Sequence, residues 1–136
     1  MLWNQLRPTT GGWNVLPNDY PSSAATEQVA HVFHALAEPR RLYAIRYLSS
    51  FNPGAEVDLQ RIGKSVAGQE RDIAPEDVDN PAYKSVREAL HSHHLPALDQ
   101  CGAIEYGGDR TPVTVRPELR FYSATVSLVA TWIQFE

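Results

Sequence analysis

Histidine and cysteine are the first residues of this chain to consider as metal ligands. His31 and His34, and likewise His91 and His94, are spaced so that each pair shares one face of a helix. Protein zinc sites usually add closely spaced cysteines, and this chain has a single cysteine, Cys101. His94 also falls on an apolar stripe, which favours a packed histidine over a ligand. We therefore predict no metal site and no cofactor.

Catalytic motifs are the second possibility. The sequence contains no Gly-x-Ser-x-Gly nucleophile turn, no phosphate-binding loop and no His-Glu-x-x-His pair. The histidines around residues 31–34 have no matching ligand motif further along the chain. We therefore predict no catalytic residues and no enzymatic activity.

Hydrogen-bonding side chains between residues 84 and 93 support a third kind of chemistry. A helix that carries such groups opposite its apolar stripe can bring them to base edges in the major groove of DNA. Here the candidates are Lys84, Ser85, Arg87, Glu88, His91 and Ser92, with His93 extending the set. Arg87 is the candidate for a guanine or phosphate contact.

Arginines elsewhere in the chain could add contacts to the DNA backbone. Arg110 follows Gly107-Gly108 in a turn, where a cation can enter the minor groove or touch phosphate. Arg116 flanks the strand expected after that turn, and Arg40 and Arg41 lie near a helix N-terminus that could hold phosphate. Alternatively, all of these are solvated surface residues of a fold that contacts proteins.

Composition limits the partners. The 136 residues suit one domain, and 43% apolar with 21% charged residues is typical of a soluble globular chain. Twelve Lys and Arg against 16 Asp and Glu give a net charge of −4, which excludes a strongly basic nucleic-acid binder but not a local basic patch. Much of the acid excess lies in an expected loop over residues 70–81. Ten Arg and only two Lys suggest GC-rich coding or a salt-adapted cytoplasm.

Helical periodicity begins at residue 26, where Thr26 is a candidate N-cap, and Pro39 separates the first helix from a second that ends before residues 52–54. Arg40, Arg41 and Arg46 are expected on or near the polar side of that second helix. Asp58 is a candidate cap for a third helix.

A long helix is expected to start at Asn80-Pro81, to be interrupted at Pro96 and to end at Gly102. Residues 103–106 and 111–116 then predict two strands joined by the Gly-rich turn. The fold class is mainly α with a small β-hairpin, and this element order is that of a winged helix-turn-helix.

Two segments flank this winged-helix domain, which we place at residues 26–116. Residues 1–25 contain Trp3, Trp13 and several prolines, and we interpret them as an extended arm that packs on the body or on a partner; a disordered leader is the alternative. Residues 117–136 predict a C-terminal helix, with a strand as the alternative because of the β-branched residues.

A family resemblance agrees with the element order. Residues 90–106, LHSHHLPALDQCGAIEY, resemble the recognition helix and first wing strand of ArsR-like regulators, and residues 35–48, ALAEPRRLYAIRYL, resemble their opening segment. Residues 33–116 also resemble a family of haloarchaeal winged-helix domains of unknown function. The resemblance implies an archaeal DNA-binding regulator of transcription. The acidic loop departs from the short turn between the two helices of a standard helix-turn-helix.

The C-terminal helix predicts self-association. Its apolar residues exceed what a small winged-helix core needs, and we place the dimer interface on Tyr122, Val126, Val129, Trp132 and Ile133, with the first helix as a possible second contact. The alternative is that this helix folds back and covers its own domain. The sequence shows no secretory signal and no membrane span, so we expect a cytoplasmic protein. The predicted function is sequence-specific binding of double-stranded DNA by a homodimer; the alternative is a protein-interaction module that binds no DNA.

Overall fold

A computed structural model describes residues 22–108 and 110–134 of the chain. Trp3 and Trp13 of the expected arm lie outside these residues. The chain divides into two compact units after Ala30, which lies inside the first described helix, α2 (Ser23–Ala35). The expected cap Thr26 lies within α2, and Ser22 precedes the helix instead, where its Oγ accepts a hydrogen bond from the N–H of Ala25 at 3.2 Å.

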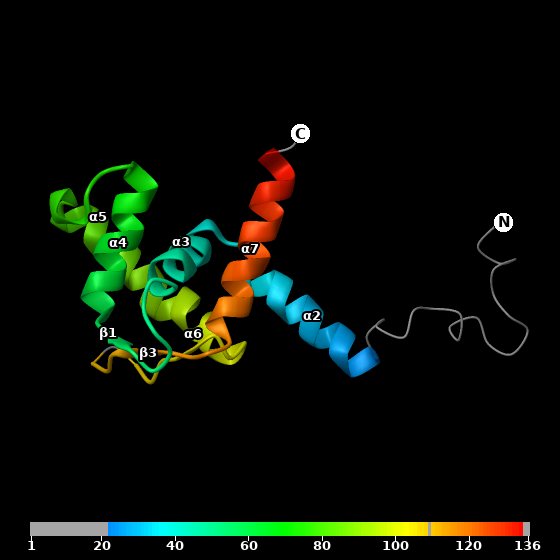
Figure 1. The fold of residues 1–136 in the computed structure, drawn as a ribbon. Coiled ribbons are helices and arrows are strands. Elements are labelled where there is room, and N and C mark those ends of the chain that lie inside the picture. The colour runs from blue at the N-terminus through cyan, green and yellow to red at the C-terminus, as the bar shows by residue number, and fades with distance from the viewer. Residues whose placement is uncertain (1–21, 109, 135–136) are drawn as a thin grey trace, which may run out of the picture. The chain divides into compact units, whose positions relative to one another are not determined.

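Residues from His31 onward form a mainly helical body with one small sheet, whose path can be followed in Figure 1. After the end of α2 come α3 (Pro39–Leu48), β1 (Glu56–Val57) and α4 (Leu59–Arg71). A 3-10 turn, η2 (Pro75–Asp77), leads to α5 (Asn80–Ala89), a wider π-type turn η3 (Leu90–His94), and α6 (Leu95–Gln100). The chain ends with β2 (Ile104–Glu105), β3 (Val113–Val115) and α7 (Leu119–Gln134).

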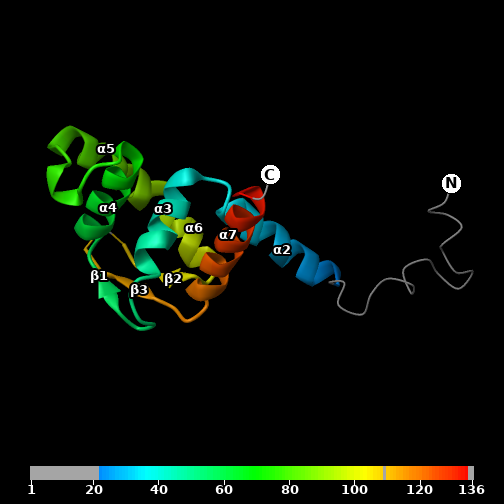
Figure 2. The ribbon, with the colours of Figure 1, turned by 45° about the horizontal axis from the view of Figure 1, so that its top comes forward.

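The predicted hairpin is present, and a third strand joins it. The strand order is β1-β3-β2, with both pairs antiparallel and Thr114 opposite Glu56 on one side and Glu105 on the other. Figure 2 shows the sheet under one side of the helices. The two-residue strand β1 was missed because it is too short to show an alternating pattern.

One apolar core joins the sheet to helices α3 to α7. Its largest fully buried side chains are Ile45, Leu48, Val57, Ile62, Val66, Leu90, Leu95, Leu98, Ile104, Val113 and Leu119. Helices α4 and α5 approach closely at Gly63, where a Cβ atom would stand 2.9 Å from the Tyr83 ring. Burial of this cluster is the main stabilising contribution to the body.

Gly102 ends α6 as expected. Its φ of +83° is a left-handed conformation that glycine adopts without strain. The N–H groups of Gly102 and Ala103 donate to the carbonyls of Asp99 and Leu98, both at 3.0 Å, which is the hydrogen-bond pattern of a Schellman cap. This turn delivers the chain from α6 into β2.

The helix boundaries differ from expectation around the acidic loop. Helix α4 continues to Arg71, so Glu70 belongs to the helix and the loop is reduced to residues 72–79. Asp79, and not Asn80, caps α5: its carboxylate accepts from the N–H of Ala82 at 2.9 Å. One acidic side chain of the loop therefore has a structural role.

Candidate nucleic-acid interface

The helical segment α5–η3 carries most of the predicted DNA-contacting residues. Ala82, Val86 and Leu90 are buried against the core, which leaves the opposite face open. The side chains exposed on this segment include Lys84, Ser85, Glu88, Ser92 and His93, while Arg87 and His91 are half-buried. Ser92 Oγ donates to Glu88 Oε1 at 3.1 Å, so these two exposed side chains are hydrogen-bonded to each other on the helix surface.

The predicted interruption at Pro96 takes the form of the π-type turn. The N–H of Leu95 donates to the carbonyl of Leu90, one residue further back than in an α-helix. Proline has no N–H to donate to the preceding turn, so it fits where the α-helical pattern has been broken and a new helix begins. The wider turn also carries His94 on the buried side and His93 on the exposed side.

His91 joins this helical segment to the sheet. Its Nδ1 lies 2.7 Å from the Tyr106 hydroxyl, and the two rings meet edge to face with centroids 6.1 Å apart. Tyr106 follows β2 directly, and its own N–H donates to Asp99 Oδ1 at 3.1 Å. The segment 106–112 between β2 and β3 therefore starts beside the helix, and it carries the exposed Arg110.

Arg41 lies in the interior of the body, and our prediction that it lies on the polar side of its helix is wrong. It is 8% exposed, and it shares the buried stripe of α3 with Ala44, Ile45 and Leu48. The spacing 41, 44, 45, 48 is that of one helix face, and this signal was available in the sequence. The charge of Arg41 is thus turned away from any phosphate outside.

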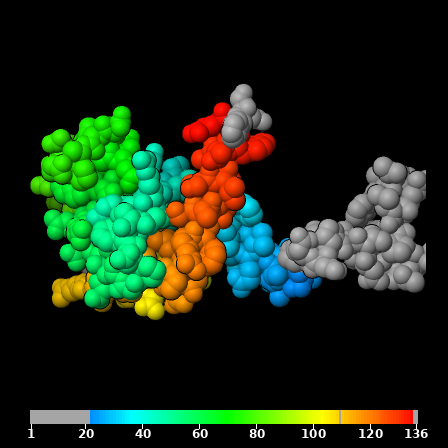
Figure 3. All heavy atoms as spheres, in the orientation of Figure 1, coloured from blue at the N-terminus to red at the C-terminus, as the bar shows by residue number. Residues whose placement is uncertain are grey.

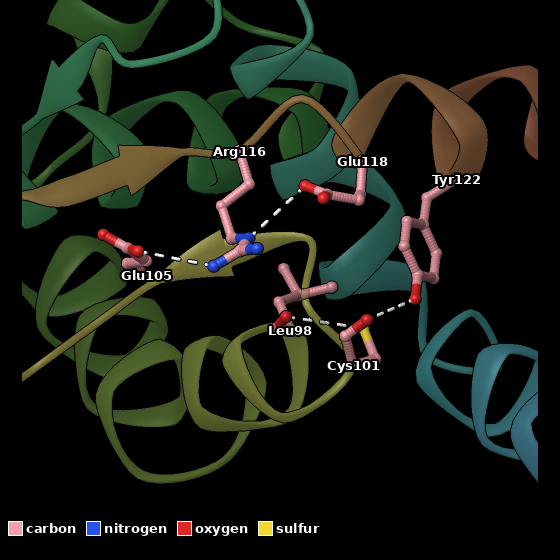
Figure 4. A network of polar contacts seen from close by, with 6 residues as sticks. All are labelled: Leu98, Cys101, Glu105, Arg116, Glu118 and Tyr122. Carbon is pink, nitrogen blue, oxygen red and sulfur yellow. Dashed lines mark hydrogen bonds and ion pairs between the residues drawn. The ribbon is translucent and has the colours of Figure 1, made fainter.

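Two other arginines that we predicted to contact phosphate form ion pairs with carboxylates of the protein itself. Arg40 Nε lies 2.6 Å from Glu70 Oε2. Arg116 bridges two carboxylates, Glu105 and Glu118, at 3.3 Å each, as Figure 4 shows. Hydrogen bonds from the Glu118 backbone and from Arg116 lower the pKa of the Glu118 carboxyl.

Several exposed acidic side chains precede the start of α5. Glu76, Asp77 and Asp79 are exposed just before the helix, and Asp72 is exposed at the end of α4. DNA-reading helices commonly use their N-terminal residues, where these charges would repel phosphate. Along the chain, Glu88, His91, Ser92 and His93 lie further from these acids than Lys84 and Ser85 do.

The predicted dimer residues fall into two groups. Tyr122 is buried in its own body, and its hydroxyl donates to the Cys101 carbonyl at 2.6 Å (Figure 4). Burial and this hydrogen bond raise the pKa of Tyr122. The prediction that Tyr122 faces a partner is therefore wrong, because its side chain ties α7 to the end of α6.

The second half of α7 presents an apolar surface. Trp132 is 66% exposed and Ile133 58%, and Leu128 and Val129 are exposed as well. Figure 3 shows the last turns of this helix extending beyond the rest of the body. Between α7 and the end of α2 and start of α3 lies a groove of about 390 Å³; its lining is Phe33, Leu36, Ala37, Leu42, Thr125, Val126, Val129, Ala130 and Ile133.

Neither metal ligands nor a membrane span emerge from the described part of the chain. Within residues 22–108 and 110–134, no three His, Cys, Asp or Glu side chains gather in a way that could hold a metal ion. Among the helices of the same residues, none has the length and apolar character needed to cross a bilayer.

The comparisons with known proteins give one result. Residues 33–114 match the model of a domain family of unknown function, DUF7344. The chain belongs to the DUF7344 family. The match covers the body from the end of α2 to β3, and so includes α5, η3 and the β2–β3 loop but not α7. No curated protein and no solved structure matches the chain.

Proposed function

We propose that this DUF7344 protein is a sequence-specific DNA-binding regulator of transcription with a winged-helix arrangement that acts as a homodimer. In this proposal α3, α4 and the α5–η3–α6 segment are the three helices, and β2, β3 and the loop between them are the wing. The observation that carries it is the α5–η3 helix: buried on one side, hydrogen-bonding on the other, and joined to the wing through His91 and Tyr106.

The proposed contacts with DNA follow from exposure and charge. Lys84 and Arg110 are exposed cations that suit phosphate oxygens, and Ser92 and His93 are exposed hydrogen-bonding groups that suit base edges. The proposed contact set is Lys84, Ser85, Arg87, Glu88, His91, Ser92, His93 and Arg110. Arg41 leaves this set because it is buried, and Arg40 and Arg116 leave it because carboxylates of the protein already offset their charges.

The proposed dimer uses the second half of α7. Its exposed Leu128, Val129, Trp132 and Ile133 lie beside a groove with an almost wholly apolar lining, and a second copy offers both a helix and a groove in return. Such a self-complementary surface suits a two-fold dimer. Two reading helices about 34 Å apart would then match a palindromic site.

A fluorescence-anisotropy titration with labelled duplex, repeated across salt concentrations, tests the proposed function. For a DNA binder, the logarithm of the affinity falls linearly with the logarithm of the salt concentration, and the slope is set by the number of phosphates that the protein neutralises. Lys84→Ala and Arg110→Ala should each reduce this slope, whereas Lys64→Ala should not, because the Lys64 ammonium donates to the Val78 carbonyl at 3.2 Å inside the protein.

A protein-interaction module without DNA binding is the second candidate, and the exposed acids before α5 favour it. The same titration separates the two functions. Failure to retain any duplex, even at low salt, would overturn the DNA proposal and leave the acidic loop and the apolar α7 surface as protein-binding surfaces.

A further inference from the structure

A buried contact between an arginine and a histidine joins three segments of the body. Arg41 Nε donates to His94 Nδ1 at 3.2 Å, and Arg41 Nη1 donates to the backbone carbonyl of His34 at 3.1 Å. Both side chains are 8% exposed. One guanidinium on α3 therefore holds the end of α2 and the η3 turn together.

The contact fixes the protonation state of His94. A guanidinium has only donors, so Nδ1 must offer its lone pair, and the neutral ring carries its proton on Nε2. An imidazolium would place N–H against N–H and a second positive charge beside Arg41. The hydrogen bond exists only while His94 is neutral.

The surroundings favour this neutral form. Burial is the largest cause that lowers the pKa of His94 below its ordinary 6.5, followed by the charge of Arg41. Arg40 and His93 act in the same direction, and Glu38, from just before α3, opposes them. Burial and the three nearby cationic or titratable side chains therefore outweigh Glu38, and His94 is harder to protonate while it contacts Arg41.

We propose that Arg41 and His94 form a proton-sensitive latch, which holds the η3 turn on α3 and thereby sets the position of the half-buried His91 and the exposed Ser92 and His93. Protonation of His94 opens the latch, because the imidazolium can no longer accept from Arg41. The consequence for DNA affinity rests on the function proposed above; the latch itself does not.

The direction in which pH changes the stability of the latched state follows from the difference in proton binding between the two states. His94 has a lower pKa in the latched state than in an open or unfolded state, where it titrates near 6.5. The open state therefore binds more protons. The latched state keeps its full advantage above pH 6.5 and loses it progressively as the pH falls from 6.5 toward the lowered pKa.

Two substitutions separate the latch from a general histidine effect. His94→Asn places a side-chain oxygen, which does not titrate, near the position of Nδ1 and keeps an acceptor for Arg41. His34→Asn is the matched control, because the His34 side chain is exposed and Arg41 contacts only its backbone carbonyl. Both variants are made in the full chain.

Histidine NMR titration and amide hydrogen exchange between pH 8 and 5 are the measurements. In the wild type and in His34→Asn, we expect His94 to titrate below 6.5 and the amide protection of residues 90–95 to fall as it does. In His94→Asn, protection should stay constant over this range. A wild-type His94 pKa of 6.5 or above would overturn the latch, and so would amide protection that stays unchanged while His94 titrates. Both outcomes are measured on the wild type, so they decide the matter even if the variant fails to fold.

Duplex affinity measured over the same range tests the link to function. The ratio of wild-type to His94→Asn affinity should fall below pH 6.5 by up to about tenfold per pH unit, the limit for one linked proton. An absence of DNA binding at every pH would contradict the function and leave the NMR result to judge the latch. DNA binding with a constant ratio would contradict the link alone.

Discussion

Two helical surfaces of this molecule, the outer face of α5–η3 and the second half of α7, are both exposed but differ in chemistry. The first presents Lys84, Ser85, Glu88, Ser92 and His93, and the second presents Leu128, Val129, Trp132 and Ile133. A polar surface is stable in water without a partner, whereas a contiguous apolar surface favours association. In the function proposed above, α7 would determine assembly and α5–η3 would determine what the assembly recognises.

The largest expected effect comes from placing charge on the α7 surface. Leu128→Glu with Trp132→Glu should convert the dimer to a monomer and weaken duplex binding by roughly hundredfold, because the second half-site is no longer bound intramolecularly. Sedimentation velocity and anisotropy measure the two effects.

Ser127→Glu with Thr131→Glu is the matched control, since it adds the same charge to the same helix at exposed polar positions. This control should stay dimeric. Equal oligomeric states for the two double variants, or a monomeric wild type at high micromolar concentration, would contradict the assignment of assembly to α7.

Arg87 is the sharpest test of the polar surface. If the guanidinium makes a bidentate contact to guanine, Arg87→Ala should reduce the free energy of discrimination against other bases at that position by ~1–3 kcal/mol. Arg110→Ala should instead weaken binding evenly over all sequences. Affinities for a set of single-base operator variants distinguish the two. Equal losses on every sequence would show that Arg87 touches only phosphate.

Tyr122 tests whether the first half of α7 belongs to the body. Tyr122→Phe removes the hydrogen bond to the Cys101 carbonyl and should lower the free energy of unfolding by about 1 kcal/mol. The dimer and its DNA affinity should not change. Denaturant unfolding gives the first quantity, and a dissociated dimer at unchanged stability would refute this placement of Tyr122.

The smallest effect is expected from the acidic loop. Glu76→Gln with Asp77→Asn removes two exposed negative charges before α5 and should strengthen duplex binding by a few-fold at low salt, with a smaller gain at high salt because exposed charges are screened. Asp79 is left unchanged because it caps α5. Unchanged affinity at low salt would place the loop away from DNA.

Much of the fold could be predicted from the sequence where a pattern repeats. The stripe of Val86 and Leu90, the stop at Gly102 and the C-terminal helix were all visible as periodicity or turn chemistry. The two-residue strand β1 was not, because its pairing with β3 depends on contacts between distant residues.

The site was less predictable because charge alone does not tell whether a side chain faces outward. Arg41 was expected to bind phosphate, but its place on the stripe of Ile45 and Leu48 turns it inward, where His94 accepts its hydrogen bond. Arg116 does lie at the surface, but the carboxylates of Glu105 on β2 and of Glu118, just before α7, pair with its guanidinium.

Selection of bound duplexes from a random library by the full-length protein tests the central claim most directly. The account predicts enrichment of a palindromic site whose half-sites are centred about one helical turn apart, ~34 Å. Wild-type affinity for that site should exceed its affinity for scrambled duplex and should fall with salt. Sequencing that shows no enrichment, together with no duplex retained at low salt, would contradict the account.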